Sequence, residues 1–177
     1  MRLFIAINFD EQIKSNIDNI IKKIRNYATQ GRFVNKEHMH LTLEFLGEIP
    51  RERVKDITSA MEALDFAPFI LSLSSIGFFK GRDGHIYWLG IKKNNDLIDM
   101  QKELHNLLLE RGFKLENRKY KAHITIGRQV KLLNTFNPEE LEDEVREIQI
   151  PVNRIELMKS ERINGKLVHT RIFSKNL

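Results

Sequence analysis

The residues best suited to chemistry in this sequence are two histidine-threonine pairs, each interrupted by a single apolar residue. His40 and Thr42 lie in "HLTL", and His123 and Thr125 lie in "HITI". Because side chains alternate across a β-strand, Leu41 can enter a core only if its two polar neighbours point to the opposite face. One such pair is common on the wet face of an ordinary strand, so only its recurrence indicates a site.

The first pair closes a strand-helix-strand unit. Residues 2–8 alternate like a strand, and Asp10 is suited to cap the helix that follows. The apolar stripe of this helix predicts that it continues until Gly31. The strand that contains His40 comes next.

A second unit repeats this order. Residues 86–93 read as a strand, Asn95 can cap a helix with its own apolar stripe, and Gly112 can end that helix. The strand that contains His123 follows. In both units the histidine comes 34 or 35 positions after the middle of the first strand. This matched placement favours a functional site over two unrelated surface pairs.

The side chains of the two pairs indicate a reaction at phosphorus. If both units turn these faces into one cleft, two imidazoles can serve as general acid and general base on opposite sides of a reacting centre. Threonine hydroxyls can bind non-bridging phosphate oxygens. The motifs contain no carboxylate pair and no cysteine. We therefore expect metal-free in-line displacement at phosphorus, without a cofactor.

Further elements complete each half of the chain. We expect a helix after Pro50 through residues 54–64, a strand over residues 69–79 and a short helix that begins after Asn137. A hairpin should turn at residues 164–165, which read Asn-Gly. No linker or low-complexity tract interrupts this order, so we expect residues 1–177 to form a single bilobal domain.

Composition limits the class of protein. The chain has 177 residues, of which 41% are apolar and 30% charged, as in a folded protein with a substantial core. The absence of Cys excludes a disulfide framework, a thiolate nucleophile and a cysteine zinc site. No stretch is long enough to span a bilayer, and the apolar N-terminal run is too short for a signal peptide. We expect a cytoplasmic monomer that does not bind membranes.

Positive charge is concentrated in one segment. The net charge is only +5, but residues 111–131 contain seven basic residues and a single acid, Glu116. This pattern fits either a surface for a phosphate-bearing partner or a solvated loop. The seven basic residues are Arg111, Lys114, Arg118, Lys119, Lys121, Arg128 and Lys131.

The two motifs also carry a family resemblance. "HLTLEFLGE" and "HITIGR", about eighty positions apart, resemble the paired HxTx motifs of the two-histidine (2H) phosphoesterases. Within them the chain is similar to the RNA 2′,3′-cyclic phosphodiesterases, also called LigT-like proteins or 2′-5′ RNA ligases. The resemblance implies an α+β fold with two pseudo-symmetric lobes around a central groove. Each lobe would be an antiparallel sheet with helices on its outer face.

The same resemblance implies a reaction and roles for six residues. The enzyme would hydrolyse a terminal 2′,3′-cyclic phosphate of RNA, tRNA fragments among the candidates, to a 2′-phosphomonoester. His40 corresponds to the general acid that protonates the departing O3′, and His123 to the base that activates water. Thr42 and Thr125 correspond to the phosphate-binding hydroxyls. The remaining substrate-binding residues are Arg128, which ends the second motif, and Phe45, which can stack on the terminal base.

Strand parity complicates the last two assignments. Phe45 and Arg128 each follow their histidine by five positions, which places them on the opposite face of an unbroken strand. They reach the groove only if the strand ends or bulges first, and we expect Gly47 and Gly127 to allow this. Otherwise Phe45 would pack in the core and Arg128 would be a surface cation.

The other four histidines are assigned no catalytic role. His38 and His40 could share a strand face like a metal-binding pair, but no third ligand lies near them in the sequence. We therefore expect no metal site. His85, His105 and His169 are expected to be structural or surface residues.

Two kinds of alternative stay open at this level. The same residues could act on a small cyclic phosphate or a 2′-5′ linked oligonucleotide, as a nuclease or a ligase. A non-catalytic module could instead hold RNA ends without turnover. Two titratable groups at matched positions argue against the module, because binding alone does not require them.

Overall fold

Two antiparallel sheets form the centre of the structure, a computed structural model that describes all 177 residues. The first sheet has the strand order β3-β1-β8-β9, and the second has the order β2-β6-β5-β4-β7. The strands are β1 (Arg2–Asn8), β2 (Ala28–Phe33), β3 (His40–Glu48), β4 (Phe69–Phe79), β5 (His85–Ile91), β6 (His123–Leu132), β7 (Gln149–Val152), β8 (Arg154–Ile163) and β9 (Lys166–Asn176).

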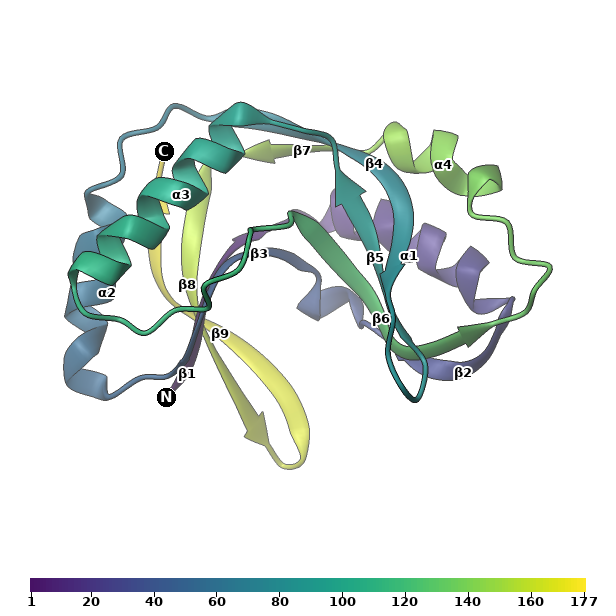
Figure 1. The fold of residues 1–177 in the computed structure, drawn as a ribbon, viewed down its shortest axis with the longest axis horizontal. Coiled ribbons are helices and arrows are strands. Elements are labelled where there is room, and N and C mark those ends of the chain that lie inside the picture. Colours follow the sequence, from purple (N-terminus) through teal and green to yellow (C-terminus); the bar gives the residue numbers. More distant parts are fainter.

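The four helices cover the two sheets in pairs. In Figure 1, α2 and α3 lie beside the first sheet on the left, whereas α1 and α4 lie beside the second sheet on the right. Accordingly, α3 contacts β3 and α2 contacts β9, while α1 contacts β2 and α4 contacts β4. α3 connects β5 and β6 of the second sheet but covers the first sheet, and α1 follows β1 of the first sheet but covers the second. The helices are α1 (Glu11–Arg25), α2 (Val54–Glu62), α3 (Asn95–Glu110) and α4 (Glu139–Arg146), with short 3₁₀ turns η1 (Lys36–His38) and η2 (Arg51–Arg53).

One hydrophobic core joins both halves. A single cluster of 37 buried residues draws on both sheets and all four helices. The expected α+β fold, with two antiparallel sheets and helices on them, is confirmed. None of the helices combines the length and apolar character needed to cross a membrane.

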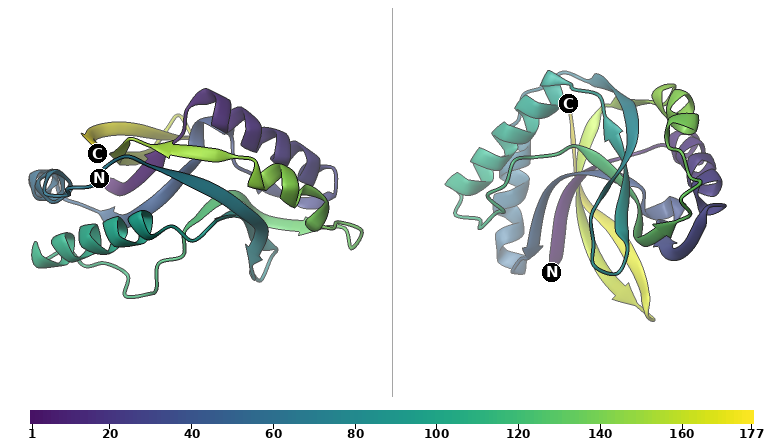
Figure 2. Two further views of the ribbon diagram at one scale, coloured as in Figure 1. Left: turned by 90° about the horizontal axis from the view of Figure 1, so that it is seen from above. Right: turned by 45° about the vertical axis from the view of Figure 1, so that its right-hand side comes forward.

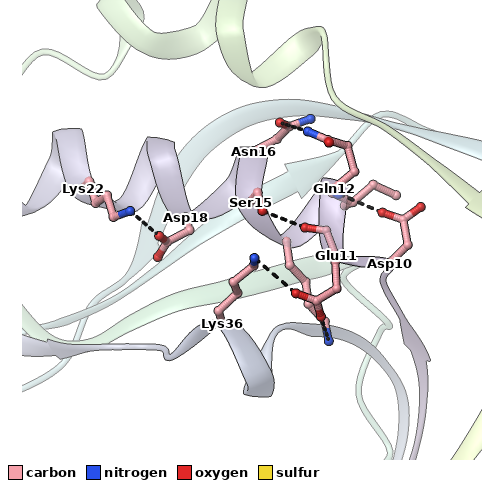
Figure 3. Close-up of polar contacts among 10 residues, drawn as sticks. Asp10, Glu11, Gln12, Ser15, Asn16, Asp18, Lys22 and Lys36 are labelled. Carbon is pink, nitrogen blue, oxygen red and sulfur yellow. Dashed lines mark hydrogen bonds and ion pairs between the residues drawn. The ribbon is translucent and has the colours of Figure 1, made fainter.

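The start of α1 is fixed by polar contacts that the sequence partly predicted. The backbone N–H of Ile13 donates to Asp10 Oδ1 over 2.8 Å, so Asp10 is the N-cap. Figure 3 shows Lys36 of η1 reaching Glu11 in the first turn, with 3.1 Å between Nζ and Oε2. This ion pair ties η1, which directly precedes β3, to the helix.

The end of α1 differs from the prediction. The helix stops at Arg25, and residues 28–33 form β2 at the edge of the second sheet. Gly31 lies inside this strand at φ +133°, and a Cβ there would come within 2.7 Å of the Val130 Cα in β6. Because β2 is mostly exposed, it has no apolar alternation that a sequence pattern could detect.

The later helices begin close to the expected positions. Asn94 rather than Asn95 caps α3, because Asn94 Oδ1 accepts the backbone N–H of Leu97 over 2.9 Å. Asn137 Oδ1 accepts the N–H of Glu139 over 3.1 Å at the start of α4. α3 therefore has an asparagine N-cap one residue before the expected one, whereas Pro138 holds the N-cap position of α4 and Asn137 precedes it.

The predicted hairpin joins β8 and β9. Asn164 and Gly165 have φ of +50° and +78°, the left-handed pair that a two-residue turn requires. The strands pair from Arg154 and Asn176 to Ile163 and Lys166. Figures 1 and 2 show the tip of this hairpin projecting beyond the rest of the molecule.

Candidate active site

The two histidine-threonine pairs line one cavity. β3 of the first sheet contacts β6 of the second, and these strands begin at His40 and His123. We call the cavity of about 420 Å³ between them the central cavity. Its wall includes all six residues that the sequence indicated, namely His40, Thr42, Phe45, His123, Thr125 and Arg128.

A bulge in β3 turns Phe45 toward this cavity. Thr42 pairs with Ala6 of β1, but Glu44 pairs with the preceding Ile5, so Leu43 is an extra residue. Leu43 and Glu44 are consequently both buried, and Phe45 is 41% exposed. The extra residue reverses the alternation, so Phe45 joins the face of the histidine.

β6 has a bulge at the equivalent position, three residues after its histidine. Thr125 pairs with Trp88 of β5 and Gly127 with Tyr87, so Ile126 is the extra residue. Arg128 is thereby exposed to the cavity. A bulge was expected in both motifs, at Gly47 in the first. The bulge that turns Phe45 toward the cavity instead lies at Leu43, before Phe45. Its position follows from the register of β3 with β1.

Each histidine ring is oriented by a backbone carbonyl two residues earlier. His40 Nδ1 lies 2.7 Å from the oxygen of His38, and His123 Nδ1 lies 2.6 Å from the oxygen of Lys121. A carbonyl oxygen only accepts, so Nδ1 must carry the hydrogen in both rings. Nε2 is then the nitrogen that can exchange a proton in the cavity.

Burial lowers the pKa of both histidines. The pKa of His40 falls to about 4, chiefly because burial disfavours its charged form. Burial also lowers the pKa of His123, and the nearby cations Lys121 and Arg118 act in the same direction. Both rings are therefore neutral near pH 7 while the cavity holds no anion. An anion bound between them would favour protonation of either ring.

Two histidines that the sequence assigned no role in the site also line the central cavity. The ring centroid of His169 lies 5.5 Å from that of His40 and 4.8 Å from that of His38. Phe4 packs on His40 at 4.8 Å and on His169 at 5.0 Å. His169, expected to be a structural or surface residue of the hairpin, is thus a partly buried residue of the cavity wall. The sequence gives no signal for it, because β9 is a largely polar strand.

A second cavity adjoins the first. It has about 450 Å³ and shares with the central cavity the residues Thr42, Phe45, His123, Thr125 and Arg128; we call it the lateral cavity. Four of the seven cations of residues 111–131 line it, three of them from the segment before β6. The basic segment is therefore more than a solvated loop. These four cations are Arg118, Lys119, Lys121 and Arg128.

Aromatic rings hold one of these cations in place. Lys121 Nζ lies 4.5 Å from the centroid of Trp88 and 4.9 Å from that of Phe79. The Phe79 ring in turn meets His123 edge-on at 5.1 Å. Tyr120, the neighbour of Lys121, donates its hydroxyl to the carbonyl of Thr42 over 2.9 Å. The segment before β6 is thus attached to both motifs.

The donor chemistry of the protein offers no clear metal centre. No group of three or more His, Cys, Asp or Glu side chains is arranged to hold a metal ion. The arrangement around the central cavity instead combines two imidazoles, two hydroxyls and a guanidinium. Such a set can bind an oxyanion and move protons on both sides of it.

Comparison with known proteins agrees with this chemistry. The chain matches the family described as LigT like Phosphoesterase over residues 7–87 and 89–169, and each segment contains one HxTx motif. The RNA 2′,3′-cyclic phosphodiesterase of Thermotoga maritima is 34% identical over 154 residues, which are 85% of this chain and 79% of that protein. The enzyme of the same name from Methanocaldococcus jannaschii is 37% identical over 147 residues, which are 82% of this chain and 79% of that protein.

A solved structure supports the likeness of fold. The crystal structure of Escherichia coli LigT complexed with 3′-AMP has a TM-score of 0.83 to this protein at 26% sequence identity. The match covers 99% of this chain and 97% of that one. The similarity therefore extends over both sheets and both motifs.

Proposed function

Because the chain belongs to the LigT-like phosphoesterase family, we propose that it is an RNA 2′,3′-cyclic phosphodiesterase that leaves a 2′-phosphomonoester. The observation that carries this proposal is the matched pair of histidines. Each has Nδ1 fixed by a carbonyl and Nε2 left for proton transfer, and both line one cavity. A site that only held phosphate would not need two rings oriented in this way.

The proposed reaction is a single displacement at phosphorus. His123 Nε2 takes a proton from water as the water oxygen attacks the phosphorus of the cyclic ester. The bond from phosphorus to O3′ breaks, and His40 delivers a proton to O3′. The 2′-oxygen stays bound to phosphorus, which yields the 2′-phosphate. His123 gains one proton and His40 loses one, so the two transfers balance within one turnover.

The neighbouring side chains stabilise the charge that develops. The hydroxyls of Thr42 and Thr125 donate to the non-bridging oxygens, and the guanidinium of Arg128 offsets their negative charge. Phe45 stacks on a base next to the phosphate. No step requires a metal ion, so activity should survive a chelator.

The low pKa of His40 sets a condition on its role as acid. The ring must gain a proton before O3′ can leave, although its pKa is about 4 without substrate. The cyclic phosphate brings a negative charge into the cavity, which raises the pKa of both rings. Substrate binding therefore supplies the protonation that the free protein lacks.

The decisive test is the identity of the product. The purified protein should convert a short RNA with a 2′,3′-cyclic end to the 2′-phosphate in the presence of EDTA. His40→Ala and His123→Ala, prepared in parallel, should lose this activity and so exclude a contaminating ribonuclease. A 3′-phosphate product would contradict the proposed mechanism, as would activity that a chelator abolishes and a divalent ion restores. Binding without turnover would identify the protein as an RNA-end-binding module.

A further inference from the structure

A polar group of the lateral cavity has no part in the proposed reaction. Glu44 lies directly after the bulge of β3 and is 7% exposed, which is rare for a carboxylate. It lines the cavity two residues after Thr42, one of the proposed phosphate ligands. A buried carboxylate needs partners, and their arrangement indicates what else it could bind.

Two side chains of α3 occupy one oxygen of this carboxylate. His105 Nδ1 lies 2.7 Å from Glu44 Oε2, and Gln101 Nε2 donates to the same oxygen over 3.3 Å. Gln101 Nε2 is also 3.4 Å from the carbonyl oxygen of Leu43. Because both neighbours are acceptors, the amide must present its nitrogen to them and its oxygen elsewhere. The orientation of Gln101 is thus fixed.

Two acceptor atoms are left without partners. Glu44 Oε1 and Gln101 Oε1 form no hydrogen bond within the protein. Among polar side-chain atoms that are fully buried, only His38 Nδ1 and Trp88 Nε1 lack a hydrogen-bond partner. Because Glu44 Oε1 and Gln101 Oε1 also lack a partner but are not in that group, both oxygens are accessible to solvent. Since both residues line the lateral cavity, it presents two neighbouring hydrogen-bond acceptors to a ligand.

The position of the cavity suits a nucleobase. It opens into the central cavity through Thr42, Thr125 and Phe45, so a nucleotide with its phosphate between the histidines can extend its base into it. Phe45 provides an aromatic face at this junction. Enzymes that hold an unpaired base commonly read the donors and acceptors of its Watson-Crick edge.

Two adjacent acceptors select one base by chemistry. Guanine has neighbouring donors, N1–H and the N2 amino group, on its Watson-Crick edge. Adenine and cytosine have a single amino group there, and uracil has one ring N–H between two acceptors. Arg118 and Lys119 on the same cavity wall offer donors that suit the O6 atom of guanine. Uracil would instead bring its carbonyl oxygens against Glu44.

We infer that the lateral cavity reads the terminal nucleobase of the RNA and selects guanine through Glu44 and Gln101. This inference rests on the proposed function, because the phosphate between the histidines places the base. It adds a specificity-determining subsite to that function. A purely structural role for the cluster, in which Glu44 only holds α3 against β3, is the competing explanation.

The test compares four dinucleotides that differ only in the terminal nucleoside with the cyclic phosphate. The guanosine end should have a kcat/KM at least about tenfold above that of the adenosine end, the effect of a hydrogen bond to a charged group. Glu44→Gln should remove most of this preference by lowering the kcat/KM of the guanosine end. Equal rates for the four ends in the wild-type protein would overturn the inference.

A matched variant separates base reading from general charge. Glu116 lines the same cavity but is an exposed residue paired with Arg118. Glu116→Gln therefore removes one negative charge from the cavity wall, as Glu44→Gln does, but leaves the buried carboxylate of Glu44 intact. It should keep the preference for guanosine, and an equal loss in both variants would refute a specific contact. If Glu44→Gln melts early, Gln101→Met provides a second test, because it removes the neighbouring acceptor at similar volume.

Binding without turnover distinguishes this inference from the proposed function. Calorimetry should find guanosine 2′-phosphate bound at least about tenfold more tightly than adenosine 2′-phosphate. If no cyclic end is hydrolysed but guanosine 2′-phosphate is preferred, the proposed function fails and the subsite stands. If all ends are hydrolysed alike and both nucleotides bind alike, the function stands and the subsite is wrong.

Discussion

The two proposed catalytic histidines have matching backbone partners but different surroundings. His40 is enclosed by the rings of Phe4 and His169, whereas His123 contacts the edge of Phe79 beside the Lys121 cation. Burial lowers both pKa values, and that of His40 falls to about 4. A reaction that needs one proton shared between the two rings must therefore depend on pH in a particular way.

The first prediction is an acidic optimum for kcat/KM. This parameter follows the ionisations of the free enzyme, so it should peak between the pKa of His40, about 4, and the lowered pKa of His123, below 6.5. The optimum of kcat should lie at higher pH, because the bound phosphate raises both pKa values. The measurement is the pH profile of both parameters on a cyclic-ended RNA.

A side chain that does not titrate provides the control for this profile. Thr125→Ala should lower the rate without moving either optimum, because it removes a hydrogen bond and no ionisation. A kcat/KM that keeps rising above about pH 7, the upper part of the range in which histidines titrate, would show that these rings do not share the catalytic proton.

The second prediction is a graded set of substitutions in the two motifs. Replacing either histidine by Ala should cost about 10²- to 10⁴-fold in rate, typical for a lost proton-transfer group. Thr42→Ala or Thr125→Ala should cost about 10- to 150-fold, the effect of one hydrogen bond to a charged oxygen. None of these changes should lower the free energy of unfolding by more than about 1 kcal/mol, since all four side chains line the cavity.

The intervening residues should respond in the opposite manner. Leu41 and Ile124 are both 0% exposed and point into the core. Their Ala variants should lose about 2 to 5 kcal/mol of stability while the folded fraction keeps its activity. Turnover and chemical denaturation of all six variants test both halves of the prediction. If His123→Ala unfolds readily but retains its turnover, His123 is a structural residue.

The sequence revealed some site residues and concealed others for a physical reason. The His-x-Thr pairs are visible because they recur at matched positions within two apolar strands. His169 and Glu44 have no such context. His169 enters the central cavity only through the pairing of β9 with β8, and Glu44 becomes buried only through the bulge of β3. Both depend on contacts between distant segments.

At the scale of elements, local patterns predicted the helices better than the irregular strands. The apolar stripes of α1 and α3 and their asparagine or aspartate caps are written in consecutive residues. The bulges at Leu43 and Ile126 arise from the register with the neighbouring strands, which no single segment specifies. The short edge strand β2 was missed because its side chains are polar and exposed.

The third prediction concerns the attachment of β2 to β6. Gly31 has φ +133°, and a Cβ at this position would lie 2.7 Å from the Val130 Cα. Gly31→Ala should therefore cause both backbone strain and a steric clash. We expect a loss of at least about 2 kcal/mol in the free energy of unfolding. Thr29→Ala in the same strand removes one exposed hydrogen bond, to Lys131, and should cost less than about 1 kcal/mol.

Turnover should respond to Gly31→Ala as well. β2 pairs with β6 beside Arg128, through Arg32, so a detached edge would loosen a proposed phosphate ligand. KM should rise at temperatures where the variant is still folded. Equal melting temperatures for Gly31→Ala and the wild-type protein would contradict the observed packing of β2.

At the scale of the whole molecule, the placement of α1 and α3 joins the two sheets into one unit. α1 leads from β1 of the first sheet to β2 of the second and covers the second sheet, whereas α3 connects two strands of the second sheet and covers the first. The two matched segments of the chain thus share a single core, with one motif from each at the cavity between them. The positive charge of the chain is also placed around this junction, by the segment that precedes β6.

The last prediction is a salt dependence that originates in this segment. Contacts between cations and single-stranded RNA release counterions, so log KM should rise with log salt by about 0.7 for each phosphate contact. A longer cyclic-ended RNA should therefore have a steeper slope than a dinucleotide, while kcat changes little. Replacing both Arg118 and Lys119 by Gln should reduce the slope for the longer RNA by up to about 0.7 per cation. Lys22 lies on α1, with its Nζ 2.8 Å from Asp18 Oδ2, and Lys22→Gln should leave the slope unchanged. A double variant with the slope of the wild-type protein would mean that the RNA leaves the cavity by another path.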